Sequence, residues 1–428
     1  MTVRHKLHSL IALLLISLNV SAFAARIDPA RLADETKTIK PEGDFALRDG
    51  DRVLFYGDSI TEQRLYTTYV EHYVLTHYPE RRITFINTGW GGDQVTRNEC
   101  VPCNGVGGLA RIKRDVIDHQ PTVVTLLFGM NDGRYYDFDE ATMKVYTDGL
   151  TAIIHELKAK TKARLYVMTP TVYDGTRNTP WSHTTRYNEV LDRYSEAAKQ
   201  LAAREQLPVI DLHTVTTEAL MQAKKNDSSY TFLQDGVHPE ADGQLVMATE
   251  MLRAWGAPPH GVEKSIVERV IVDERLKDAG GGEVLPVLAP LSWPDPLPSE
   301  KLRAVWPQIT EMGAVTLHRL NLPPGNYKVS VDDGPPSNFT ADELARGIAL
   351  NQLSKKSQED SRAVALLIRK RADWFYTRWR QIEVPYATDY KATANVVTAF
   401  DTLIAEMAER ARVLAAPHKY EIVISRAQ

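Results

Sequence analysis

The stretch Val53-Leu54-Phe55-Tyr56-Gly57-Asp58-Ser59-Ile60 determines how the rest of the chain is interpreted. Its first four residues are aliphatic or aromatic, and they predict a short buried strand. Gly57 and Asp58 end that strand, and Ser59 opens a predicted helix. Ligands of open α/β sheets bind at the carboxyl ends of strands, where a helix N-terminus also stabilises negative charge. Taken alone, Gly-Asp-Ser is equally compatible with a capped turn, because all three residues are common in turns and caps.

The composition is that of a globular protein with more than one domain. The chain has 428 residues, of which 43% are hydrophobic and 25% charged, and its formal net charge is −4. A chain of this length can bury a large core. Without a basic surplus we expect no nucleic-acid partner and no overall attraction to anionic lipid.

The N-terminus has the pattern of a signal peptide. Basic residues Arg4-His5-Lys6 precede an apolar run over 10–20, which is short for a bilayer span. Ala22-Phe23-Ala24 is a small-residue cleavage signal. We therefore expect residues 1–24 to be removed and the mature protein to be periplasmic or extracellular, without a stable membrane anchor. An uncleaved anchor is the alternative.

Strand-like and helix-like segments alternate over residues 25–257, the predicted catalytic domain. This alternation predicts a doubly wound parallel α/β sheet with helices on both faces. The predicted strands are 53–56, 83–87, 122–128, 164–168 and 207–212, and the predicted helices are 60–78, 109–119, 140–160, 184–206, 214–225 and 241–255.

Four turns that follow predicted strands carry residues suited to acyl transfer. A serine nucleophile needs a base, a group that orients the base, and donors for the oxyanion. Asp235 and His238 lie three residues apart, and Gly236 allows a sharp turn that would bring the carboxylate to Nδ1. The His238 Nε2 would then face Ser59. Gly92 could donate a backbone N–H, and Asn131 could donate its side-chain amide; each is by itself compatible with an ordinary turn.

These turns resemble the motifs of the SGNH hydrolases, the GDSL esterase/lipase superfamily, over residues of about 50–257. The resemblance implies a flavodoxin-like three-layer αβα fold and a serine esterase that needs no metal or organic cofactor. It implies Ser59 as nucleophile, His238 as general base and Asp235 as the group that orients His238. It also implies an oxyanion hole formed by the Ser59 N–H, the Gly92 N–H and the Asn131 side chain, with Gly92 preferred to Gly89 because it directly precedes an Asp. The matching blocks are Gly57-Asp58-Ser59-Ile60, Asn87-Thr88-Gly89-Trp90-Gly91-Gly92-Asp93, Gly129-Met130-Asn131-Asp132 and Asp235-Gly236-Val237-His238-Pro239.

The only two cysteines, Cys100 and Cys103, lie in a Cys-Val-Pro-Cys loop. The loop lacks the strand–helix junction of a thioredoxin site and the further ligands of a zinc site. In an exported chain we expect these cysteines to form a disulfide. Compared with compact SGNH members, 97–107 is an insertion, which should border the substrate site.

Residues 258–428 are predicted to form a C-terminal accessory α+β extension. Three glycines and five prolines over 280–300 favour a linker or extended loop. The turn Pro323-Pro324-Gly325-Asn326 between 315–320 and 327–331 predicts a β-hairpin. The other predicted features are a capping box at Thr340-Ala341-Asp342-Glu343, helices over 358–382 and 390–415, and a strand over 420–425.

The substrate is less constrained than the chemistry. We favour an acetylesterase that acts on carbohydrate, because the chain is predicted to be exported, has an isoelectric point near 6.3 and carries Trp90 beside the oxyanion turn. Trp90 could stack on a sugar or only pack. A lysophospholipase or short-chain lipid esterase is the enzymatic alternative. The expected partner is a small ester or acylated glycan, and protein partners stay open.

A non-enzymatic alternative makes the C-terminal region a glycan- or partner-binding module, although its aromatic and basic residues are also compatible with core packing and snorkelling arginines. Those residues are Trp374, Phe375, Tyr376, Trp379, Arg369, Lys370, Arg371, Arg378 and Arg380.

Overall fold

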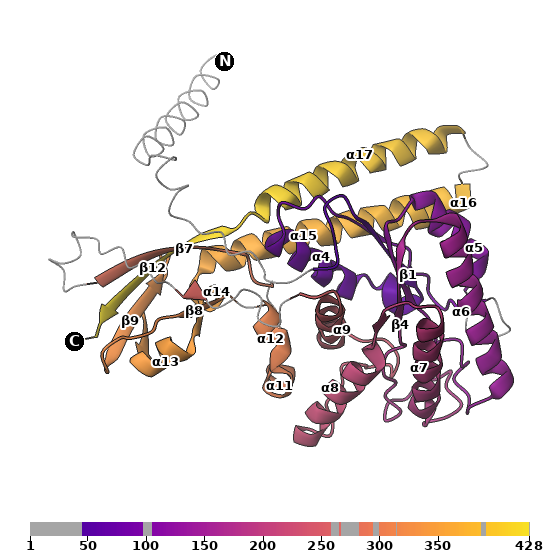
Figure 1. Cartoon of the computed structure of the whole chain (residues 1–428), viewed down its shortest axis with the longest axis horizontal. Coiled ribbons are helices and arrows are strands. Elements are labelled where there is room, and N and C mark those ends of the chain that lie inside the picture. The colour runs from indigo at the N-terminus through magenta and orange to yellow at the C-terminus, as the bar shows by residue number, and fades with distance from the viewer. Residues whose placement is uncertain are drawn as a thin grey trace, which may run out of the picture. The chain divides into compact units, whose positions relative to one another are not determined.

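A five-stranded, fully parallel sheet lies among helices α4 (Leu65–His77) to α9 (Ala241–Ala254), at the right of Figure 1. The computed structural model describes residues 45–96, 105–257, 265–266, 282–293, 299–313, 315–386 and 391–427. The strand order β2-β1-β3-β4-β5 is the flavodoxin-like order, which confirms the predicted fold class. The strands are β1 (Arg52–Gly57), β2 (Thr84–Asn87), β3 (Val123–Leu127), β4 (Arg164–Met168) and β5 (Val209–Ile210).

The sheet reverses its winding direction at β1, which pairs with β2 on one side and β3 on the other. Gly57 is in register with Leu127, and Leu127 with Met168, so three strands end at nearly the same level. The carboxyl end of β1 is therefore the topological switch point, where α/β folds bind their ligands. Ser59 is two residues beyond this end.

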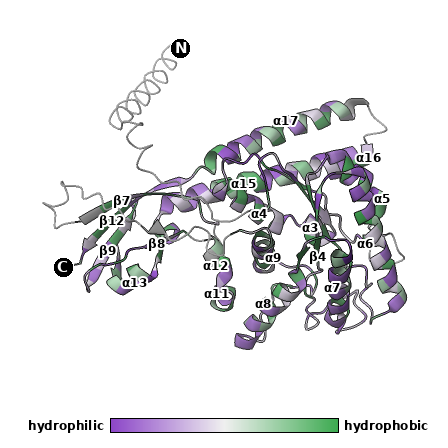
Figure 2. Ribbon diagram, viewed as in Figure 1, coloured by the Kyte–Doolittle hydropathy of each residue, from purple (hydrophilic) through white to green (hydrophobic). Residues whose placement is uncertain are grey.

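Helices cover both faces of the sheet, as right-handed crossovers require. Contacts group α4, α8 and α9 together and connect α5 to α6 and α6 to α7. Figure 2 shows hydrophobic and hydrophilic residues on different sides of helices such as α7, as expected where one side faces the sheet, whereas α4 and α9 are buried around most of their surface. The helices are α4 (Leu65–His77), α5 (Gly108–Asp115), α6 (Glu140–Lys160), α7 (Tyr187–Arg204), α8 (Leu212–Asn226) and α9 (Ala241–Ala254), with a 3₁₀ turn η1 (Ile117–His119) after α5.

The single helix predicted over 60–78 is two helices, α3 (Ser59–Glu62) and α4. The break lies at Arg64, whose φ of 62° is left-handed. Gln244 of α9 stabilises it, because its Oε1 accepts the Tyr66 N–H at 3.0 Å and its Nε2 donates to Gln63 Oε1 at 2.5 Å. A side chain from a distant helix thus replaces bonds that a continuous helix would make.

The C-terminal region builds two small sheets and a pair of long helices. A four-stranded sheet has the order β10-β9-β12-β7, and a three-stranded sheet has the order β11-β8-β6. The strands are β6 (Ser265–Ile266), β7 (Gly282–Ala289), β8 (Thr316–His318), β9 (Asn326–Val331), β10 (Ser337–Thr340), β11 (Ile348–Ala349) and β12 (His418–Arg426). The helices are α11 (Glu300–Val305), α12 (Pro307–Gly313), α13 (Ala341–Arg346), α14 (Leu350–Leu353), α15 (Lys355–Tyr376), the π-helix η2 (Thr377–Glu383), α16 (Val384–Tyr386) and α17 (Lys391–Leu414).

Two predictions for this region are wrong. The linker predicted over 280–300 contains β7, which pairs with β12 and holds Pro286 opposite Glu421. β7 is an edge strand, where a proline without an N–H can be tolerated. The predicted hairpin is also wrong, since β8 and β9 lie in different sheets and β9 pairs with β10. The capping box at Thr340 and Glu343 is confirmed.

Helix α15 attaches the C-terminal region to the catalytic domain through a buried ion pair. The Arg371 guanidinium binds both oxygens of Glu71 on α4, at 3.1 and 2.5 Å, and Nη1 donates to the Phe85 carbonyl at 3.0 Å. An apolar cluster lies nearby and is formed by Leu75, Leu291, Val364, Ile368, Ala411 and Ala415.

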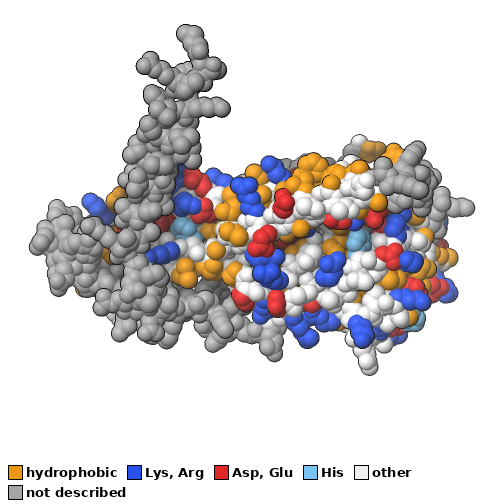
Figure 3. Space-filling model, turned by 90° about the horizontal axis from the view of Figure 1, so that it is seen from above, with side chains coloured by type: hydrophobic (Ala, Val, Ile, Leu, Met, Phe, Trp, Pro, Cys, Tyr) orange, Lys and Arg blue, Asp and Glu red, His pale blue; other side chains and the backbone are white. Residues whose placement is uncertain are grey.

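The outer surface of the two long helices is mixed in character. Figure 3 shows acidic, basic and hydrophobic side chains interspersed on the face seen from above. Several apolar side chains of these helices are exposed, namely Leu366, Trp374, Val396, Leu403, Val413 and Leu414.

The Glu71–Arg371 pair provides a stability test. We expect Arg371→Met to lower the free energy of unfolding by about 3–5 kcal/mol, because it leaves a buried carboxylate without its cation. The double variant Glu71→Leu/Arg371→Met should lose less than Arg371→Met alone, since no buried charge is left unpaired. Urea unfolding measures both, and Lys355→Met on the exposed side of α15 is the control. Equal losses in the single and double variants would contradict the expectation.

Candidate active site

Ser59 lies at the first position of α3, directly after β1. Asp58 is the N-cap, and its Oδ1 accepts the Ile60 N–H at 2.9 Å. Gly57 permits a tight approach, because a Cβ at this position would lie 2.4 Å from Thr61 Oγ1 and 2.6 Å from the Leu127 carbonyl oxygen. The local sequence therefore holds the Ser59 hydroxyl at a helix N-terminus beyond the sheet edge.

The three residues predicted to form the catalytic triad lie within hydrogen-bond distance of one another. Ser59 Oγ is 2.7 Å from His238 Nε2. His238 Nδ1 is 2.6 Å from Asp235 Oδ2. Asp235 Oδ1 also accepts the backbone N–H groups of Val237 and His238, at 2.9 and 2.8 Å. One carboxylate oxygen thus fixes the backbone of the loop while the other orients the imidazole.

Gly236 makes this loop possible. Its φ is +85°, and a Cβ there would lie 2.4 Å from Thr179 Oγ1. Thr179 Oγ1 donates to the Asp235 carbonyl at 2.7 Å, so the approach is part of how the loop is held. Glycine is the residue that combines this backbone angle with this contact.

The electrostatics of the loop favour a basic histidine. Burial alone would raise the pKa of Asp235, but the hydrogen bonds from His238 and two backbone N–H groups outweigh burial and lower the pKa to about 2. Burial opposes the charged form of His238, yet the Asp235 carboxylate raises the pKa of the imidazole above its usual 6.5. Burial raises the pKa of Asp58 to about 7, although the Ile60 N–H donates to it.

The two candidate oxyanion residues beyond Ser59 lie on linked turns. Gly92 has a φ of +70° in the turn after β2. Asn131 Nδ2 donates to the carbonyl of Asp93, the next residue, at 2.9 Å, and Asn131 Oδ1 accepts the Tyr135 hydroxyl at 2.9 Å. The Asn131 amide is therefore oriented at both ends, directly beside the Gly92 turn.

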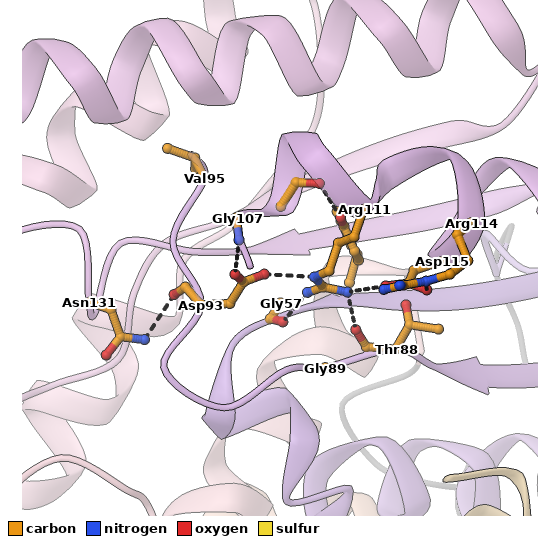
Figure 4. A network of polar contacts seen from close by, with 12 residues as sticks. Gly57, Thr88, Gly89, Asp93, Val95, Gly107, Arg111, Arg114, Asp115 and Asn131 are labelled. Carbon is orange, nitrogen blue, oxygen red and sulfur yellow. Dashed lines mark hydrogen bonds and ion pairs between the residues drawn. The ribbon is translucent and has the colours of Figure 1, made fainter. Parts of the chain in front are cut away.

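A buried guanidinium, Arg111, holds these turns together (Figure 4). Its Nη2 donates to the Gly57 carbonyl at 2.9 Å and its Nη1 to the Thr88 carbonyl at 2.7 Å. Its Nε binds Asp93 Oδ2 at 2.7 Å, and Asp115 Oδ2 lies 3.3 Å from Nη1. Arg111 thereby connects the ends of β1 and β2, the Gly92 turn and α5. Arg111 lies within the helix predicted over 109–119, but the sequence pattern did not indicate these partners.

The predicted insertion returns to the same turn. The Gly107 N–H donates to Asp93 Oδ1 at 2.6 Å, so the C-terminal end of the insertion is attached next to Gly92. Cys100 and Cys103 lie outside the described residues, and their disulfide stays a prediction.

Trp90 is a buried packing residue, as one of its two predicted roles required. The other predicted role, stacking on a sugar, is wrong. It is 7% exposed, and the Arg380 guanidinium lies 3.4 Å from its ring centroid. Trp379 meets it edge to face at 6.1 Å and donates to Asp115 Oδ1 at 2.9 Å. Trp379 and Arg380, two of the aromatic and basic residues of the C-terminal region, therefore pack against the catalytic domain.

Within the described residues, no group of three or more His, Cys, Asp or Glu side chains is arranged to hold a metal ion. None of the described helices combines the length and apolar composition needed to cross a membrane.

The chain is similar to several proteins of known structure. A gut microbial diltiazem-metabolizing enzyme, BT4096, is similar with a TM-score of 0.72 at 20% sequence identity, over 90% of this chain and 100% of that chain. An acetylxylan esterase from Geobacillus stearothermophilus, Axe2 in a catalytic mutant, shares 25% identity over 49% of this chain and 96% of that chain, with a TM-score of 0.40. A GDSL-like lipase from Bacteroides thetaiotaomicron shares 18% identity over 48% of this chain and 87% of that chain, with a TM-score of 0.36. No curated protein matched the chain.

The likeness to BT4096 shows a common fold that extends into the C-terminal region. The family is identified by the catalytic part of the chain, where residues 55–246 match the GDSL-like Lipase/Acylhydrolase family. Residues 55–246 therefore form a GDSL-like lipase/acylhydrolase domain, and the chain is an ester-bond hydrolase.

Proposed function

We propose that the protein is a serine esterase in which Ser59 is the nucleophile, His238 the general base and Asp235 the residue that orients His238. The observation that carries the proposal is the unbroken chain of contacts from Ser59 Oγ through the imidazole to the Asp235 carboxylate, at 2.7 and 2.6 Å. This is the arrangement that activates a serine hydroxyl at neutral pH.

The reaction proceeds in two acyl-transfer steps. His238 takes the Ser59 proton as Oγ attacks the ester carbonyl, and then protonates the leaving alcohol. Water, activated by the same imidazole, hydrolyses the acyl-enzyme. The Ser59 N–H at the start of α3, the Gly92 N–H and the Asn131 amide are the proposed oxyanion donors. The helix N-terminus adds a favourable dipole for the developing charge.

The proposed substrate is an acetyl ester of a carbohydrate outside the cytoplasm. The Glu62 carboxylate, whose charge contributes to the raised pKa of His238, is a polar group near the proposed catalytic residues and suits a polar alcohol. Its Oε2 lies 2.8 Å from the position that a Cβ at Gly91 would take, in the turn that also carries Gly92. Export through cleavage of residues 1–24 is part of the proposal, and that segment lies outside the described residues. A lipid ester is the competing substrate class.

The nucleophile is tested by Ser59→Ala. We expect kcat for p-nitrophenyl acetate to fall by about 10⁴–10⁶-fold, because the acyl-enzyme can no longer form. Ser182→Ala, which removes a hydroxyl that donates to the Thr184 carbonyl, is the control. Thermal unfolding should show both variants folded. Near-normal ester hydrolysis by folded Ser59→Ala would exclude the assignment.

The pH dependence follows from the raised pKa of His238. The imidazole must be unprotonated to act as a base, so kcat/KM should fall on the acid side with a midpoint above 6.5. Asp235→Asn should move this midpoint to lower pH in its residual activity, because the carboxylate that stabilises the imidazolium is removed. A pH–rate profile of both proteins measures the shift, and an unchanged midpoint would argue against the pair.

Acyl length separates the substrate classes. We expect kcat/KM for p-nitrophenyl esters to be highest at acetate and to decrease toward acyl chains of about eight carbons, because the proposed acyl group is an acetyl and a longer chain needs an apolar surface to bury it. Acetylated xylan should release acetate, and lysophospholipid should be a poor substrate. A preference for long acyl chains would instead favour the lipid-esterase alternative.

A further inference from the structure

A tyrosine of the C-terminal region reaches the helix that carries the nucleophile. Tyr376, the last residue of α15, donates its hydroxyl to Glu62 Oε1 at 3.0 Å. Glu62 is the last residue of α3, three positions after Ser59. Residues three apart on a helix are neighbours on one face, so Glu62 and Ser59 face the same side.

The Glu62 carboxylate lies within the electrostatic reach of the catalytic loop. Its negative charge is among those that raise the pKa of His238, after the larger effects of Asp235 and Asp58. Its Oε2 occupies space that a side chain at position 91 would need, since a Cβ on Gly91 would lie 2.8 Å away. The carboxylate therefore lies next to the turn that carries Gly91 and Gly92, and its charge acts on His238.

Arg64, the cation that contacts residue 62, binds its backbone and not its carboxylate. Arg64 Nη1 donates to the Glu62 backbone carbonyl at 2.6 Å, and its guanidinium lies 4.5 Å from the Tyr376 ring centroid and pairs with Asp373 at 3.2 Å. Arg380 lies over Trp90. Among the described residues, no Lys, Arg or His forms an ion pair with the Glu62 carboxylate, which is half-buried.

We propose that Glu62 and Tyr376 form a subsite that binds hydroxyl groups on the alcohol part of the ester, so that the C-terminal region determines substrate specificity. The inference rests on the proposed role of Ser59. Tyr376 occupies one carboxylate oxygen, and the other, beside Gly91, can accept hydroxyl hydrogens from a sugar. The position beside His238 is on the leaving-group side, because His238 protonates the departing alcohol. The substrate class is thus a partially acylated polyol.

The test compares a monoacetylated methyl xyloside, which carries free hydroxyls, with p-nitrophenyl acetate, which carries none. We expect Tyr376→Phe and Glu62→Gln each to lower the ratio of the two kcat/KM values by about tenfold, mainly through KM for the xyloside, because each removes a hydrogen-bonding group. Measurements are made at a pH where His238 is neutral in every variant, so that a changed imidazole pKa does not enter the ratio.

Two matched variants serve as controls. Tyr327→Phe removes another C-terminal hydroxyl, one that donates to the Pro323 carbonyl. Glu240→Gln removes an exposed carboxylate two residues after His238 that makes no capping hydrogen bond. Both should leave the ratio unchanged.

The outcomes are distinguishable from those that test the proposed function. Loss of both activities in Ser59→Ala supports the nucleophile whatever the ratio does, and retained activity there overturns both proposals. An unchanged ratio in Tyr376→Phe and Glu62→Gln, or an equal fall for both substrates, would overturn the subsite while leaving the esterase intact.

Discussion

The geometry at the active edge of the sheet depends on one buried guanidinium. Arg111 donates to the last residue of β1, to the residue after β2 and to Asp93 in the turn that carries Gly92. A guanidinium has five donors in a rigid plane, so it can satisfy several acceptors at fixed angles. Burying its charge costs several kcal/mol unless the charge is paired, and Asp93 and Asp115 provide that pairing. Ser59 and Gly92, which belong to different turns, are thereby held in one frame.

The buried carboxylates around this frame divide into two kinds. Asp93 and Asp115 share the cation, and each extends the network, to the Gly107 N–H and to Trp379 respectively. Asp58 and Asp132 have no such cation and accept backbone N–H groups instead, and burial raises their pKa values to about 7 and about 8. Asp58 caps a single turn, whereas Asp132 accepts the Gly129 N–H in its own turn and the Val95 N–H from the segment after Gly92, and so also connects two segments. In the loop that carries His238, Asp235 alone does both: one oxygen accepts the His238 backbone N–H, and the other orients the imidazole.

Much of this was predictable from local sequence, and the failures share a cause. The five strands and the turns that bring Ser59, His238 and Asp235 together follow from short sequence patterns that depend on few distant residues. The partners of Arg111 were not predictable, because a buried arginine in a helix start is indistinguishable from an exposed one until its neighbours are known. The strand β7 was missed because its partner, β12, lies far from it in the sequence, near the C-terminus. Trp90 was ambiguous for the same reason, because Arg380, which covers it, comes from a distant helix.

The C-terminal region is better understood as part of the enzyme than as a separate binding module. Tyr376, Trp379 and Arg380 have the spacing of one helix face, and each contacts a different part of the catalytic domain: Glu62 on α3, Asp115 on α5 and Trp90 after β2. The helix changes from α to π directly after Tyr376, a distortion that often accompanies functional sites. A module that bound glycans by itself would keep such aromatic residues on its surface, yet Trp379 is 1% exposed. Tyr376, Trp379 and Arg380 are therefore contacts between the C-terminal region and the catalytic domain, whereas Trp374 of the same aromatic group is exposed.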